Sequence, residues 1–179
     1  MEKDDVIKDR CIIIAKIINA IKEIYKFSNM NQKAFIQTII GAGIWYIPKP
    51  KNCWSGKISV KLLDELISNK NGKISEEHII PRKAAAKELL EDNNILELEY
   101  VENIFREKYS KLHYITPEEN KKAIKYQKTD VFENPEKVYK QAKIEFIEIN
   151  SQILKDLREG RIINKEELLK KMSDDHNCT

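Results

Sequence analysis

The stretch Lys73-Ile-Ser-Glu-Glu-His-Ile-Ile-Pro-Arg-Lys83 places an acidic residue directly before a histidine and continues with Ile-Ile-Pro. It follows the turn signal Asn69-Lys-Asn-Gly72, which ends the helix predicted before it. The sequence therefore predicts a short strand that ends at Glu77-His78. Because successive side chains of a strand point to opposite faces, the carboxylate and the imidazole would point in different directions.

The sequence after this strand predicts a helical insertion and then a second strand. Alanine-rich Lys83–Glu91 favours a helix, which Asp92-Asn-Asn94 breaks. Another helix is expected over Ile95–Tyr109. Leu112-His-Tyr-Ile-Thr116 is β-prone, because its residues alternate and it ends in β-branched side chains.

Two helix starts further along share one pattern. Thr116-Pro117-Glu118-Glu119 has Thr as N-cap, Pro at the first helical position and Glu at the third, and its helix is expected to reach Tyr126 or Lys128. Asn134-Pro135-Glu136 repeats this logic and predicts a long helix up to Gly160. The apolar face of that long helix is expected to hold Val138, Ala142, Phe146, Ile149, Ile153 and Leu157. Asn164 caps a last short helix, and 173–179 is expected to be a frayed tail.

Residues 4–27 are predicted to form one long helix with a broad apolar face. One stripe recurs at spacings of four and three: Ile7, Cys11, Ile14, Ile18, Ile21 and Tyr25. Ile13, Ile17 and Ile24 form a second stripe beside it. Such a face favours core packing, and a homodimer contact through helix 4–27 is the alternative.

The region between this helix and the first strand is expected to be partly helical. A helix is predicted over Gln32–Ala42, then an extended segment over Ile44–Pro50, because proline restricts itself and the residue before it. Ser59 is a plausible N-cap for a helix over Val60–Ser68. The lysines and aromatic residues of 46–57 fit either a DNA-contacting arm or a loop whose tryptophans close the core.

Composition favours a helix-rich protein of the α+β class. Charged residues make up 34% of the 179 residues, while Gly and Pro number five each, so an all-β sandwich is not expected. The net charge of +3 neither requires nor excludes nucleic acid. Three widely spaced cysteines indicate neither a disulfide framework nor a zinc ribbon. The N-terminal apolar run is interrupted by Lys16, so no membrane contact and a cytoplasmic location are expected.

Glu77-His78 followed by Ile-x-Pro resembles the first motif of HNH nucleases, whose ββα-metal fold is two antiparallel strands and a helix around one divalent metal. Thr116-Pro-Glu-Glu-Asn120-Lys-Lys resembles the later part of that motif, where an Asn or His on the helix completes the metal site. The resemblance covers residues 73–128. It implies a small ββα-metal core with a helical insertion, between an N-terminal helical region (1–72) and a C-terminal helical extension (129–179).

The resemblance also implies a role for each site residue. His78 would be the general base, for which the ordinary pKa of histidine is well suited. Glu77 and Asn120 would bind Mg²⁺ or Mn²⁺ through oxygen atoms. Glu76 is an alternative ligand, but alternation would point it to the opposite face. The family also expects a residue, usually Asn, that supports the histidine loop, and His113 is either that support or an unrelated strand residue.

Basic residues near these motifs are candidates for substrate contacts. Arg82 could hold a phosphate oxygen. Lys121, Lys125 and Lys128 share one face of the helix 117–128, which is either a solvated surface or a surface that tracks phosphates. Tyr126 is expected in the core, with base stacking as the alternative.

Three functions follow from these observations. The first is a metal-dependent endonuclease acting on DNA, or on RNA, of the kind found in restriction, phage defence or mobile elements. The second is a helical protein that binds nucleic acid or a partner through an HNH-like core that has lost catalysis. The third is an oligomerisation module built on helix 4–27.

Overall fold

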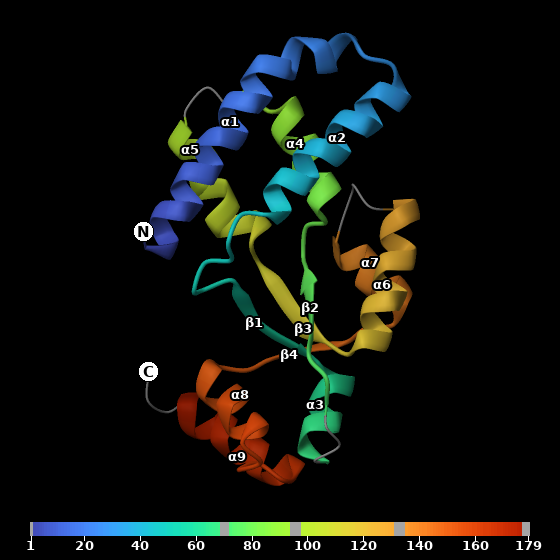
Figure 1. Ribbon diagram of the computed structural model, residues 1–179. Helices are drawn as coiled ribbons and strands as arrows, with labels where there is room; N and C mark the ends of the chain where they lie inside the picture. Colours follow the sequence, from blue (N-terminus) through green and yellow to red (C-terminus); the bar gives the residue numbers. More distant parts are fainter. Residues whose placement is uncertain (1, 69–71, 94–97, 131–134, 177–179) are drawn as a thin grey trace. The chain divides into compact units, whose positions relative to one another are not determined.

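The computed structural model describes residues 2–68, 72–93, 98–130 and 135–176, and Figure 1 shows their arrangement. The described residues are mostly helical (68%), with one small mixed sheet. The described strands lie in the order β2-β3-β1-β4. The expected α+β class with a helical majority is therefore confirmed. Within the described ranges, the helices are too short or too polar to cross a bilayer.

The chain forms two compact units that do not follow chain order. Unit 1 comprises Met1–Cys53 and His78–Lys111, and unit 2 comprises Trp54–Glu77 and Leu112–Thr179. The chain therefore crosses between the units three times, once between Glu77 and His78. The division into three consecutive segments (1–72, 73–128 and 129–179) follows the order of motifs along the chain. This division stays a prediction.

Unit 1 is helical. It contains α1 (Lys3–Phe27), α2 (Met30–Trp45), α4 (Arg82–Glu91), α5 (Leu98–Ile104) and a π-helical turn (Phe105–Tyr109). Its core holds the first stripe of α1, as expected, in which all but the partly buried Ile21 are buried. This stripe packs on α2, on the alanines and leucines of α4 and on Phe105 and Tyr109.

Two glycines of α2 allow close approach of its neighbours. A Cβ atom at Gly43 would lie 2.5 Å from Cδ1 of Ile14 on α1, and one at Gly41 would lie 3.0 Å from the carbonyl oxygen of Arg82 on α4. Because Ile44 is buried in the core, the helix continues to Trp45. The extended segment predicted from Ile44 therefore begins later than expected.

Unit 2 contains the sheet and the remaining helices. The strands are β1 (Trp54–Ser59), β2 (Ser75–His78, of which His78 lies in unit 1), β3 (Leu112–Ile115) and β4 (Phe146–Glu148). Its helices are α3 (Val60–Ile67), α6 (Pro117–Asp130), α7 (Pro135–Ala142), α8 (Ser151–Arg158) and α9 (Lys165–His176). In register, β1 is parallel to β3 (Ile58 beside Tyr114) and antiparallel to β4 (Ile58 beside Ile147).

The single long helix predicted from Pro135 to Gly160 is wrong. The chain leaves the helix after Ala142, where Lys143 takes a positive φ of 54°, and then forms β4. Pairing with β1 stabilises this strand, and Asn150 starts α8 by accepting a hydrogen bond from the Ile153 N–H at 2.8 Å. Strand β1 lies in a region predicted to be a loop, so that prediction is also wrong.

The caps predicted at Ser59, Thr116 and Asn164 are confirmed, whereas the start predicted at Asn134 lies outside the described residues. Ser59 Oγ accepts from the Leu62 N–H at 3.1 Å and starts α3. Thr116 and Glu119 form the expected capping box, in which the Thr116 N–H donates to the carboxylate at 2.9 Å and the Glu119 N–H donates to Thr116 Oγ1 at 3.2 Å. Asn164 caps α9, which extends to His176 into the expected tail, while 177–179 lie outside the described residues.

Candidate functional site

Strand β2 sends its two motif residues to different surroundings. Glu77 is buried (5% exposed) within unit 2, whereas the half-buried His78 belongs to unit 1. Glu76 is exposed, which agrees with the alternation expected for a strand.

The side chain of His78 lines a pocket of about 400 Å³ that is built entirely from unit 1. Its ring centroid lies 5.0 Å from that of Trp45, with the two planes tilted by 51°. The Arg82 guanidinium lies over the same indole, with its central carbon 5.4 Å from the ring centroid. The remaining lining residues include Tyr46, Lys49 and an apolar group: Ile44, Ile47, Ile80, Ala85, Phe105 and Tyr109.

Helix ends position this pocket. Trp45 is the last residue of α2 and Arg82 the first of α4, and Gly41 lets the two helices approach closely enough to bring these side chains together. Trp45 is 54% exposed and Tyr46 is 73% exposed. The interpretation that Trp45 closes the core is therefore wrong. Trp54 does pack on the core of unit 2, where its ring stacks on Tyr114 at 5.2 Å.

The carboxylate of Glu77 lies in a buried polar cluster of unit 2. It accepts a hydrogen bond from Nε2 of Gln127 on α6. Burial raises the pKa of Glu77 from 4.5 to about 7, although this hydrogen bond opposes the shift. The Tyr139 hydroxyl is buried and has no hydrogen-bond partner within the described ranges. Near neutral pH, Glu77 is therefore present in both its protonated and its ionised form.

Asn120 lies two helical turns before Gln127 on α6, but it has a different hydrogen-bond partner. Its Nδ2 donates to Ser75 Oγ at 2.7 Å, and its Oδ1 is buried without a partner in the described part of the chain. The structure thus holds Glu77 against Gln127 and Asn120 against Ser75. The two expected metal ligands therefore have different hydrogen-bond partners, and Oδ1 of Asn120, the atom expected to bind the metal, has no hydrogen-bond partner among the described residues. The residues with described side chains also contain no group of three or more His, Cys, Asp or Glu suited to a metal.

His113 is a buried strand residue of unit 2. Its Nδ1 lies 2.6 Å from Ser55 Oγ, and its ring packs on Phe146 with centroids 4.5 Å apart. Burial, together with the positive charge of Lys57, lowers the pKa of His113 from 6.5 to about 4. The residue is therefore neutral at physiological pH and serves as a hydrogen-bonded core residue of β3.

The lysines of α6 whose side chains are described are surface residues. Lys121 and Lys125 are exposed one turn apart, while the side chain of Lys128 lies outside the described residues. Tyr126 packs on the core of unit 2, so its predicted place in the core is confirmed. Two exposed lysines fit a solvated surface and a surface that tracks phosphates equally well.

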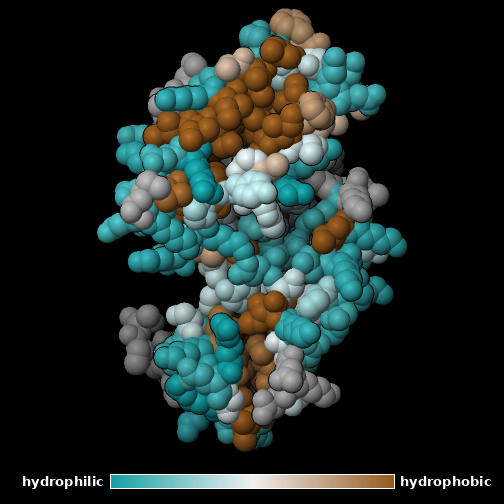
Figure 2. Space-filling view, viewed as in Figure 1, coloured by the Kyte–Doolittle hydropathy of each residue, from teal (hydrophilic) through white to brown (hydrophobic). Residues whose placement is uncertain are grey.

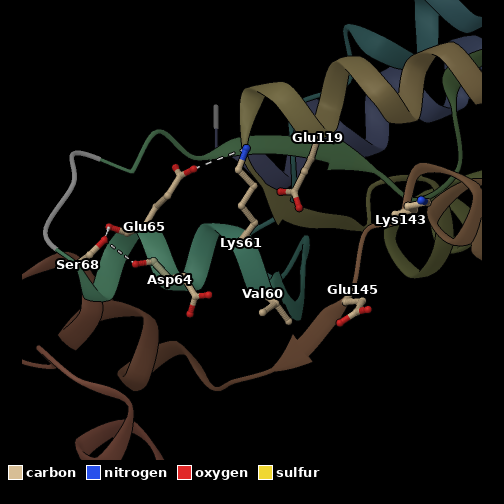
Figure 3. A pocket seen from close by; sticks show the side chains of 8 residues that line it. All are labelled: Val60, Lys61, Asp64, Glu65, Ser68, Glu119, Lys143 and Glu145. Atoms are coloured by element: carbon tan, nitrogen blue, oxygen red, sulfur yellow. Dashed lines mark hydrogen bonds and ion pairs between the residues drawn. The ribbon is translucent and has the colours of Figure 1, made fainter.

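A second pocket, of about 440 Å³, lies in unit 2 and is shown in Figure 3. Its polar lining is mostly acidic, from α3, α6 and the segment just before β4: Asp64, Glu65, Glu119 and Glu145. Lys61 and Lys143 supply the opposing charge. An excess of carboxylates repels phosphate, so this pocket is a poor site for nucleic acid.

Two contacts of these sites carried no signal in the sequence. The contact between Trp45 and His78 joins residues 33 positions apart, and Gln127 looked like an ordinary polar residue of a helix. No protein-family model matches the sequence, and searches among curated proteins and among solved structures return no match. The likeness to HNH nucleases therefore rests on the two short motifs alone.

Proposed function

We propose that the protein is an endonuclease of the HNH type that acts on DNA, with the phosphodiester bound at the unit 1 pocket around His78. One observation carries this proposal. The histidine of the Glu-His-Ile-Ile-Pro motif lines a pocket next to an arginine and an exposed tryptophan. An imidazole, a guanidinium and an aromatic face are the groups that a phosphate and a neighbouring base require.

In this pocket each side chain has a distinct role. His78 accepts a proton from the attacking water, a role for which an imidazole is suited because its ordinary pKa lies close to neutral pH. As the water oxygen bonds to phosphorus, the bond from phosphorus to one sugar oxygen breaks, and this leaving oxygen takes up a proton from solvent. Arg82 donates hydrogen bonds to the non-bridging phosphate oxygens and stabilises the charge that develops on them. Trp45, which is exposed beside both, offers a ring face on which an adjacent base can stack.

Nicking of supercoiled plasmid tests this proposal. We expect the purified protein to nick the plasmid, and we expect His78→Ala to abolish nicking while its circular dichroism stays unchanged. Arg82→Ala should reduce nicking and Arg82→Lys should restore part of it, whereas Lys83→Ala, at the adjacent exposed position of α4, should have little effect. Parallel reactions with Mg²⁺, Mn²⁺ and EDTA test the expected metal dependence. Undiminished cleavage by His78→Ala would overturn the assigned role.

A second candidate is a protein that binds nucleic acid without cleaving it. It is favoured by the separate hydrogen bonds of Glu77 and Asn120, because each expected metal ligand has a hydrogen-bond partner of its own. Such a protein should retard a DNA duplex at low salt and lose affinity as salt rises, yet leave the DNA intact in Mg²⁺. Arg82→Ala should then weaken binding, while His78→Ala should leave the DNA equally intact.

A further inference from the structure

Helix α1 carries a second apolar stripe that the core of unit 1 does not cover. Ile13, Ile17, Ile24 and Phe27 are 54%, 41%, 63% and 81% exposed, and Ala20 between them is exposed as well. The five positions are spaced by four, three, four and three residues. This is the a/d spacing by which two helices pair in a coiled coil, and we call these residues the outer seam.

The outer seam is part of a wider apolar surface. Figure 2 shows brown surface gathered over α1 and α2 of unit 1. On α2, Phe35 and Ile39 are exposed apolar residues as well, at 66% and 51%. Contiguous apolar surface of this kind on a soluble unit indicates an interface.

The two flanks of the outer seam differ in character. One flank leads towards α2, because Ile14 meets the backbone of that helix at Gly43. The other flank carries Lys16 and Glu23, which are both exposed and lie one heptad apart. We call these two residues the flank pair. They occupy the positions whose charges select the partner and the orientation in a coiled coil.

We propose that α1 pairs with α1 of a second copy of this chain, antiparallel, through the outer seam. The proposed register places Ile17 against Ala20 of the partner subunit and Ile13 against Ile24 of the partner subunit. In this register Lys16 of each copy lies beside Glu23 of the partner subunit. Two opposite-charge contacts then form, one on each side of the two-fold axis. The same two-fold brings the α2 surfaces of the copies to the opposite flank.

The other ways of pairing two copies are less favourable. Sliding the helices by one heptad, so that Ile13 meets Ile17 of the partner subunit, places the two lysines of the flank pair beside one another. In a parallel pair Lys16 would face Ile21 of the partner subunit and Glu23 would face Ser28 of the partner subunit, so neither charge would meet an opposite charge. The charges therefore select one antiparallel register.

Sedimentation equilibrium of the full chain across a concentration series tests the pairing. We expect a monomer–dimer equilibrium in which Ile17→Asp raises the dimer Kd on the order of a hundredfold, since two copies of the side chain are buried. Ile163→Asp, at a 64% exposed isoleucine of unit 2, is the matched control and should leave the Kd unchanged. A monomer at every concentration overturns the proposal and assigns the face to a different protein.

Charge reversal tests the register. Lys16→Glu and Glu23→Lys should each weaken the dimer by about tenfold, because each turns two attractive contacts into repulsive ones. The double variant restores both attractions and should return the Kd close to that of the wild type. If the double variant stays as weak as the single ones, the antiparallel register is wrong. These measurements need no nucleic acid, so their result is independent of the proposed nuclease function.

Discussion

The carboxylate of Glu77 accepts its hydrogen bond from Gln127 on α6, two turns after Asn120 on the same helix. Asn120 instead donates to Ser75, which precedes Glu77 by two residues and shares its face of β2. Strand and helix are thus joined by two parallel polar contacts. This pairing makes Glu77 a buried, protonatable residue of unit 2, and its effect on stability can be measured.

Glu77 should lower the stability of the protein as pH rises. Its pKa is raised from 4.5 to about 7, so between these values the folded state holds a proton that the unfolded chain releases. Its contribution to the free energy of unfolding should fall by roughly 3 kcal/mol across this window and stay constant above it. Urea unfolding at pH 5 to 8 should show that Glu77→Gln removes this fall. Glu76→Gln, at the exposed neighbour, should retain it.

His113 should act in the opposite direction over an overlapping range. Its pKa is lowered from 6.5 to about 4, so between these values the unfolded chain binds a proton that the folded state excludes. Its contribution to stability is therefore lost as pH falls from about 6.5 to about 4. His113→Gln should remove this loss and reveal the effect of Glu77 alone. The double variant Glu77→Gln/His113→Gln should have the free energy of unfolding that changes least with pH. If the free energy of unfolding of His113→Gln depends on pH as in the wild type, His113 does not have the lowered pKa.

Trp45 should supply most of the tryptophan fluorescence response to single-stranded DNA. Its indole is exposed beside His78 and Arg82, whereas Trp54 is stacked on Tyr114 inside unit 2. Trp45→Ala should weaken binding by about 1–3 kcal/mol, the usual value for one stacked base. Trp54→Phe serves as the control and should keep both the affinity and the quenching measured by titration. Quenching that persists in Trp45→Ala would place the DNA elsewhere.

Ser59 and Glu119 should show strong coupling in a double-mutant cycle. Ser59 Oγ donates to the Glu119 carboxylate at 2.6 Å and at the same time caps α3, while the same carboxylate completes the capping box of α6. Each alanine substitution should cost about 1–3 kcal/mol in urea unfolding, because it leaves a buried polar group without its partner. The double substitution should cost clearly less than the sum of the two. Additive costs would show that the two caps are independent.

Features set by local sequence were predictable. The heptad stripe of α1 and the capping box at Thr116 depend on residues within one or two helical turns, and both are present in the structure. The first strand of the motif was also predicted, because a turn signal precedes β2.

Features set by distant pairing were not predictable. Strand β4 has three residues, and its Ile147 is held in the sheet by Ile58 of β1 rather than by any local preference. The same apolar residues fit a helical face when Lys143 is read as an ordinary helix residue, although it takes a positive φ. At the site, residue types suggested His78, Glu77 and Asn120 from their chemistry. They could not reveal that Gln127 and Ser75 are the hydrogen-bond partners of the last two.

The interleaving of the two units affects how the chain is made. Helices α1 and α2 emerge from the ribosome first, but the α4 and α5 surfaces that complete their core lie beyond Arg82, on the far side of a segment that belongs to unit 2. At typical rates of 5–20 residues per second, translation from Trp45 to Ile104 takes roughly 3 to 12 s. During that interval the nascent helical hairpin presents both isoleucine stripes to solvent. The growing chain should therefore depend on a ribosome-associated chaperone more than the finished protein depends on any chaperone.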